Sequence, residues 1–228
     1  MELKDYAPKP KELKGHFCIE VVNKNTGKVI DSYEDNNLIV NKARFSMSKL
    51  LANHPDTVVR PTSGITGFKI GTRGHNTLTD NILEPKIVGQ DGYDESREKL
   101  FSQEAVDAFF YSISWDPKNL LQNEAGAPAA WQNDSITFIA KGQKKAQTGA
   151  EVDAENAKIP VTILLGTDSV KYTFEISEAW MNGSNSNSVV AFTEAGLFTG
   201  SDLFSIKCFP AKVKDNQTLF RIHWKIIF

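Results

Sequence analysis

The sequence predicts an all-β protein, a jelly-roll-like β-sandwich with one short helix and long loops. Apolar and polar residues alternate in many short runs, as they do in strands with one buried face. Clusters of glycine, asparagine and proline separate these runs at the intervals typical of all-β folds. The clearest alternation is in residues 219–228, where Trp224 lies at the centre of the apolar set. We expect roughly nine to eleven strands.

Composition limits the classes of function. The chain has 228 residues, 40% of them apolar, which suffices for one substantial core or two small ones. A formal charge of −2 argues against bulk electrostatic binding to nucleic acid or to an anionic membrane. No stretch approaches the ~20 apolar residues of a membrane span, and the N-terminus lacks the apolar region of a secretion signal. We expect a soluble protein with neither partner, in which Cys18 and Cys208 are buried free thiols rather than a disulfide.

The N-terminal region predicts an arm followed by a hairpin. Residues 1–15 are polar and carry two prolines, so we expect an extended arm before a single sandwich domain of residues 16–228. The runs 16–22 and 28–33 flank an asparagine-rich turn in which Gly27 can adopt a positive φ.

One helix is expected after residues 37–40, which continue in an extended conformation. Asn41 is a suitable first residue, and Pro55 blocks any continuation. Apolar residues recur at helical spacing between them, at Ala43, Met47, Leu50 and Leu51.

The middle of the chain alternates strands with polar segments. Strands are expected at 65–71, 108–115, 135–141, 159–166 and 169–177, and the charged residues 89–104 tolerate a helix. Long polar loops are expected at about 116–135 and 141–158. Loops of this length are more often binding or assembly surfaces than simple connections.

The C-terminal region predicts three strands. Residues 188–198 and 203–209 flank a turn of small residues, so we expect a hairpin whose return strand ends at Pro210, because proline has no N–H for the ladder. In the last strand Arg221, His223 and Lys225 alternate with the apolar face and should point outward.

Catalytic and metal-binding patterns are weak. The four histidines are scattered without the short spacings of metal sites, and the glycines between 64 and 74 lack the strand and helix of a phosphate loop. Asp91, Asp94 and Glu95 belong to a charged run typical of a solvated surface, and no nucleophile elbow is present. We therefore expect a protein that is not an enzyme and has no cofactor or metal.

Glu194 is an acid inside an apolar hairpin, and a buried acid needs a partner. Lys212 or Arg221 from neighbouring strands could supply it, which would make Glu194 a structural anchor. Exposure at a sheet edge and a role as a catalytic acid are the alternatives.

Aromatic and basic residues in loops are candidate interaction residues. The chain has an aromatic group of Trp115, Trp131, Tyr172 and Trp180. Of these, Trp131 and Trp180 lie in predicted loops and could form a sugar-stacking or docking platform, although loop tryptophans more commonly cover the core. Arg73, with His75 in the same loop, could contact a neighbouring subunit or be solvated.

Four motifs in this order resemble a group of tailed-bacteriophage virion proteins from the tail, baseplate or neck region. They are NLIVNKARFSMSKLLA, ITGFKIGTRGHNTLTDNILEPK, SVVAFTEAGLF and LFSIKCFPAKVKDNQTLFRIHWKIIF. They correspond to a strand leading to a small helix, a strand ending in a GTG-like sequence, an E-x-GLF hairpin and a closing W-x-I-x-F strand. The spacing in Gly71-Thr72-Arg73-Gly74 departs from the usual one, and the segment 116–158 matches no part of the pattern.

This resemblance implies a structural and assembly component of a phage tail, synthesised in the host cytoplasm and located in the virion tail. Its partners would be other tail proteins and copies of itself in a ring, or it would be an adaptor that joins tail core and fibres. The alternative is a receptor- or carbohydrate-binding module that recognises a host-surface glycan through the loop tryptophans. A glycan depolymerase is less favoured, because such enzymes show long repetitive strand arrays.

Overall fold

The computed structural model describes residues 13–51, 64–106, 108–116, 133–146, 151–182 and 189–228. The helical elements are α1 (Asn41–Leu51) and the 3₁₀ helix η1 (Phe101–Gln103). The strands are β1 (Lys14–Asn23), β2 (Val29–Ile39), β3 (Gly67–Gly71), β4 (His75–Asn76), β5 (Asn81–Pro85), β6 (Phe109–Ser114), β7 (Ser135–Ala146), β8 (Glu151–Leu165), β9 (Ser169–Ile176), β10 (Val190–Thr199), β11 (Asp202–Lys214) and β12 (Thr218–Ile227).

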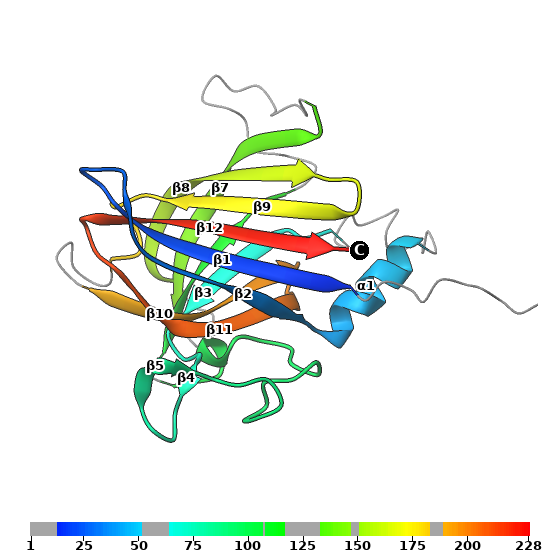
Figure 1. Ribbon diagram of the computed structural model, residues 1–228, viewed down its shortest axis with the longest axis horizontal. Coiled ribbons are helices and arrows are strands. Elements are labelled where there is room, and N and C mark those ends of the chain that lie inside the picture. The colour runs from blue at the N-terminus through cyan, green and yellow to red at the C-terminus, as the bar shows by residue number, and fades with distance from the viewer. Residues whose placement is uncertain (1–12, 52–63, 107, 117–132, 147–150, 183–188) are drawn as a thin grey trace, which may run out of the picture.

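Ten strands form one closed barrel in the order β1-β12-β9-β8-β7-β6-β3-β10-β11-β2, and β2 returns to β1 (Figure 1). All neighbours are antiparallel, and β4 and β5 form a small separate sheet. The predicted sandwich is therefore wrong. The alternation that marks a strand with one buried face is the same in a sandwich and in a barrel. Closure depends on the pairs Ser205–Ile39 and Ile206–Leu38, which join residues far apart in the sequence.

Aromatic side chains fill the barrel interior. Trp224 is fully buried and packs edge-to-face on Phe17 and Phe68, with ring centroids 4.9 and 6.3 Å apart. Phe68 stacks on Phe174 at 4.4 Å. Arg221, His223 and Lys225 remain partly exposed, so the predicted phase of the last strand is confirmed.

The predicted turns and helix are also confirmed. The β1–β2 turn places Gly27 at φ 65°, and the β10–β11 turn places Gly200 at φ 62°. Helix α1 begins at Asn41, buries Ala43 and packs Met47 against the core. Cys18 and Cys208 are free thiols.

Several predicted boundaries change. Strand β11 continues past Pro210 to Lys214, because the register with β10 shifts between Phe192 and Glu194, and a proline is tolerated at such a bulge. Most of the predicted loop 141–158 belongs to β7 and β8, which pair with each other. The helix-tolerant residues 89–104 form only one short 3₁₀ helix, η1.

The expected N-terminal arm ends earlier than predicted, because β1 begins at Lys14 and Leu13 packs against the core. Residues 1–12, and the predicted loop from 117 to 132, lie outside the described residues. No helix in the described ranges is long and apolar enough to cross a membrane.

Truncation of Trp224 tests the packing of the interior. We expect Trp224→Ala to lower the free energy of unfolding by about 3–5 kcal/mol, because a large cavity would replace the indole. Lys225→Ala, on the outer face of the same strand, should change it by less than about 0.5 kcal/mol. Denaturant unfolding curves measure both, and equal effects would contradict the described phase of β12.

Candidate interaction surface

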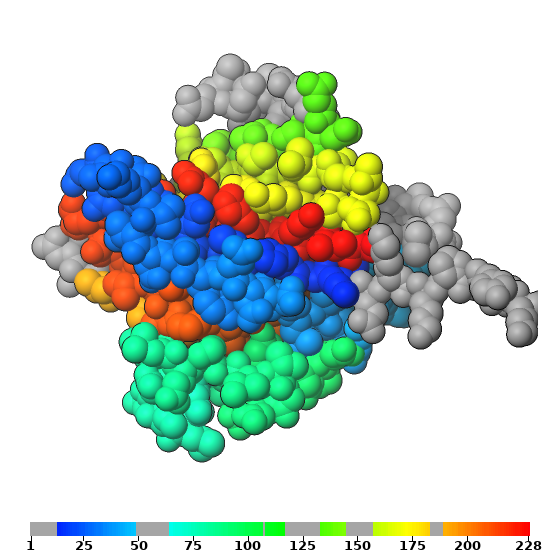
Figure 2. Space-filling view, in the orientation of Figure 1, coloured from blue at the N-terminus to red at the C-terminus, as the bar shows by residue number. Residues whose placement is uncertain are grey.

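Residues 72–106 form a lobe outside the barrel. The lobe contains β4, β5 and η1 and packs against the outer faces of β10 and β11. It appears at the bottom of Figure 1, and in Figure 2 it projects from the barrel as the teal and green atoms.

A second apolar core joins the lobe to the barrel. Tyr93 and Leu100 of the lobe pack on Leu203, Ile206 and Cys208 of β11. The Tyr93 hydroxyl donates to the Ile206 carbonyl at 3.3 Å and accepts from the Cys208 N–H at 3.2 Å. Strands β10 and β11 are therefore buried on both faces, and the burial of their residues is nearly continuous along each strand.

Glu194 fastens the lobe through backbone N–H groups. Its carboxylate is fully buried and accepts from the N–H of Phe101 at 2.8 Å, from the N–H of Ser102 at 2.6 Å and from the Ser102 hydroxyl. Burial raises the pKa of Glu194, and these hydrogen bonds oppose the rise by stabilising the carboxylate. Glu194 is thus a structural anchor, as one of the sequence-based alternatives proposed.

The partners predicted for Glu194 are wrong. Lys212 instead binds Asp31, with Nζ 2.8 Å from the carboxylate, and Arg221 pairs with Glu20 at 3.2 Å. Two of the three donors are backbone N–H groups, which lie 93 and 92 positions away from Glu194 in the sequence. A backbone N–H has no residue signature, so pattern reasoning could not find them.

The turn that contains Arg73 completes the attachment. The Ser102 hydroxyl oxygen accepts from the N–H groups of Thr72, at 2.8 Å, and Arg73, at 3.0 Å. The N–H of Gly74 donates to the Thr193 hydroxyl at 2.8 Å. A Cβ at Gly74 would lie 2.3 Å from the Thr193 carbonyl oxygen, so this position requires glycine for the close approach. The Arg73 backbone therefore serves the lobe attachment.

The outer side of the lobe displays large apolar side chains. Leu78 and Val106 are 85% and 87% exposed, and four others are 43–65% exposed: Ile82, Leu83, Ile87 and Val88. We call Leu78, Asp80, Ile82, Leu83 and Glu84 the hairpin tip. Glu84 accepts from Thr79 at 2.9 Å and from Asn81 at 3.1 Å, which holds the β4–β5 turn in shape. Exposed apolar groups on an anchored element are typical of protein–protein contacts.

The predicted tryptophan platform is not formed by Trp180. This side chain is only 3% exposed and packs edge-to-face on Tyr111 at 5.2 Å. It also lies directly over Gly142, where a Cβ would be 2.5 Å from the ring. Trp180 therefore covers the core, as Trp115 and Tyr172 do, and Trp131 lies outside the described residues.

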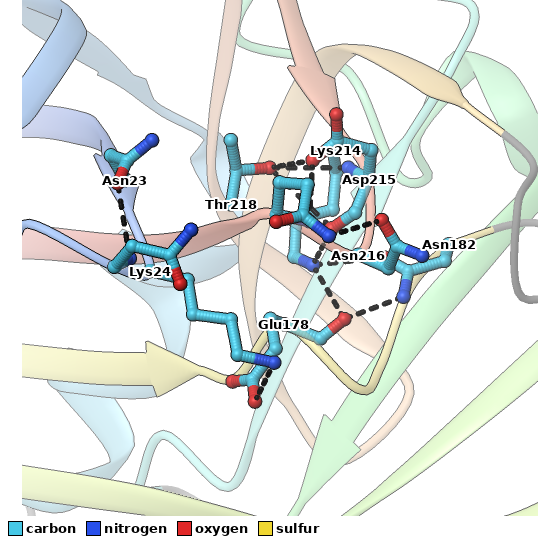
Figure 3. A network of polar contacts seen from close by, with 10 residues as sticks. Asn23, Lys24, Glu178, Asn182, Lys214, Asp215, Asn216 and Thr218 are labelled. Atoms are coloured by element: carbon cyan, nitrogen blue, oxygen red, sulfur yellow. Dashed lines mark hydrogen bonds and ion pairs between the residues drawn. The ribbon is translucent and has the colours of Figure 1, made fainter.

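A buried lysine network joins loops at one end of the barrel (Figure 3). Lys214 is fully buried, and its Nζ donates to Asp215 O at 2.8 Å, Asn182 Oδ1 at 2.9 Å and Glu178 O at 3.3 Å. Burial lowers the pKa of Lys214 to about 8. Lys24 pairs with the Glu178 carboxylate at 3.0 Å. All three ammonium donors are used within the protein, so this network stabilises the loops. No local pattern predicts this network, because Lys214 precedes an ordinary polar turn.

The described residues contain no group of three or more histidine, cysteine, aspartate or glutamate side chains that could hold a metal ion. No protein-family model, curated protein or solved structure matches the chain. The candidate site is therefore defined by its geometry alone.

Replacing the Glu194 carboxylate tests the attachment of the lobe. In Glu194→Gln an amide NH₂ would face donors, so we expect a loss of about 1–3 kcal/mol in unfolding free energy. Amide hydrogen exchange should accelerate first in residues 93–104. The matched control Glu175→Gln loses only an exposed ion pair with Arg221 at 3.7 Å, so it should change the unfolding free energy by less than about 0.5 kcal/mol and leave the exchange of residues 93–104 unchanged. Uniform acceleration over the whole barrel would contradict a local anchoring role.

The lowered pKa of Lys214 predicts a pH dependence with a defined sign. Between about pH 8 and 10.5 the unfolded chain keeps the proton that the folded protein releases, so the unfolding free energy should rise with pH in this window. We expect a rise on the order of 1–3 kcal/mol in the wild type relative to Lys214→Met. Unfolding curves of both proteins at several pH values measure it. A difference independent of pH would show that Lys214 titrates normally.

Proposed function

We propose that this protein is a structural and assembly component of a bacteriophage tail, as a ring, baseplate or adaptor protein. The observation that carries the proposal is the anchored lobe with its exposed apolar hairpin tip. A filled barrel gives the lobe a rigid support, and the tip presents apolar side chains that need a partner to leave water.

The four motifs that resemble phage proteins meet at the junction of lobe and barrel. The first contains Asn41, whose N–H donates to Glu95 O of the lobe at 2.8 Å. The second forms β3 and the start of the lobe, and β3 pairs with β10. The third carries Glu194, and the fourth begins with β11, which packs on Tyr93. Four motifs that are distant in the sequence thus build the junction of lobe and barrel, which supports a functional role for the lobe.

The buried titratable groups also support a structural role. Catalytic acids and bases must reach a substrate. Glu194 and Lys214 are instead fully buried and bonded to the protein itself. The alternative of a carbohydrate-binding module depended on Trp131 and Trp180, and the burial of Trp180 removes half of that platform.

The proposal predicts a fixed place in a virion. Purified tailed particles from cells that carry the gene should contain the chain at a constant copy number by mass spectrometry. Antibody labelling in electron micrographs should mark the tail. Normal infectious particles made without the chain would overturn the proposal.

A paired variant tests the role of the lobe in particles. Leu78→Ser/Leu83→Ser should fold normally, because both side chains are exposed, yet enter particles poorly. Val189→Ser is the matched control, since Val189 is 62% exposed and lies outside the lobe. Equal incorporation of all three proteins would exclude the hairpin tip as an assembly surface.

A further inference from the structure

The side of the barrel opposite the lobe carries a facing pair of lysines. Lys171 of β9 lies directly across from Lys225 of β12, and Leu164 of β8 is the next residue in the same row. We call these three residues the lysine patch. Leu164 is 47% exposed, and the neighbouring Leu165 is 41% exposed.

The charges of the lysine patch are not balanced within the described chain. On this face the ion pairs are His16 with Glu34, and Arg221 with Glu20 and Glu175, and neither lysine takes part. Burial lowers the pKa of the adjacent His223, and the positive charge of Lys171 lowers it further. Like charges directly opposite each other destabilise a sheet. An external carboxylate would relieve this repulsion.

The hairpin tip carries the complementary groups. Asp80 is 87% exposed, and its one described ionic neighbour is His75, at 3.6 Å, which pairs only when protonated. Glu84 is bonded only to the neutral groups of Thr79 and Asn81 among the described residues. Most other lobe acids are paired with cations, for example Glu95 with Arg44, whereas Asp94 accepts from the N–H of Ser96. The tip therefore combines two uncompensated carboxylates with exposed leucines.

The barrel order places the two surfaces on opposite sides. Three strands, β3, β6 and β7, separate β10 from β8, and three others, β2, β1 and β12, separate β11 from β9. The lobe lies on β10 and β11, and Lys171 lies on β9. In Figure 1, β8 and β9 are near the top and the lobe is at the bottom.

We propose that the hairpin tip of one copy docks on the lysine patch of the next copy, head to tail. Asp80 and Glu84 would face Lys171 and Lys225, and the tip leucines would pack beside Leu164. Because the surfaces lie on opposite sides, one two-fold pair cannot engage both, so the contact repeats into a row or a ring. This inference rests on the proposed function and specifies the partner of its surface.

Charge reversal in the full-length protein tests the contact by sedimentation velocity at low salt. The wild type should form multimers larger than dimers, which dissociate as salt rises. Lys171→Glu/Lys225→Glu and Asp80→Lys/Glu84→Gln should each weaken association at least about tenfold, and the glutamine keeps an oxygen that can accept from Thr79 or Asn81. All four changes in one chain should restore it. Failure of the combined variant to associate, with its melting curve intact, would overturn the proposal.

A second lysine pair provides the matched control. Lys141 and Lys158 also face each other, on β7 and β8, and both are exposed. The exposed Leu164 and Leu165 lie at the C-terminal end of β8, whereas Lys158 lies at its middle, so Lys141→Glu/Lys158→Glu should associate like the wild type. Equal weakening by this control would place the contact elsewhere.

A mixing experiment tests the head-to-tail geometry. Lys171→Glu/Lys225→Glu retains a normal tip, and Leu78→Glu/Leu83→Glu retains a normal patch. Each should be monomeric alone, and the mixture should stop at one-to-one dimers. Multimers in the mixture would overturn the geometry. A wild type that stays monomeric would overturn self-association, whereas the presence of the chain in virions is decided independently by the particle measurements.

Discussion

The structure depends on the requirement that the buried carboxylate of Glu194 be fully hydrogen-bonded. A buried charge without donors is too costly to retain. Strand β10 places Glu194 on the outer face of the barrel, so the lobe must bring the N–H groups of Phe101 and Ser102 to it. Ser102 in turn holds the turn at Thr72. One acid thereby determines where both ends of the lobe meet the barrel.

Closure of the barrel is the second constraint. The seam between β2 and β11 has only two paired positions. Beyond them, ion pairs bridge the strands, at 2.6 Å from Lys207 to Asp35 and 2.8 Å from Lys212 to Asp31. Acids on β2 also protect its free edge, because charged edge strands resist pairing with other chains. Because this sheet edge resists pairing with another chain, the proposed assembly would use the anchored lobe rather than strand pairing.

The barrel and the lobe would contribute different properties to the proposed assembly. The interior is filled by closely packed aromatic rings such as Phe17 and Trp224, which meet edge to face, and the Lys214 network links loops at one end. These features give a stiff body whose shape changes little on binding. The surface features proposed for assembly, the hairpin tip and the lysine patch, lie on opposite sides of that body, so a rigid barrel would transmit a fixed spacing from one copy to the next.

Local patterns in the sequence determined the strand phases, the helix and the turns. The period-two alternation around Trp224 identified the buried face, and Gly27 and Gly200 marked turns, because these signals reside in adjacent residues. Only the tertiary structure decided barrel closure, the partners of Glu194 and the burial of Trp180. Each of these depends on groups distant in the sequence, namely a few strand pairs, backbone N–H donors and the space left by Gly142. Such groups leave no local pattern, because the backbone is chemically the same at almost every residue.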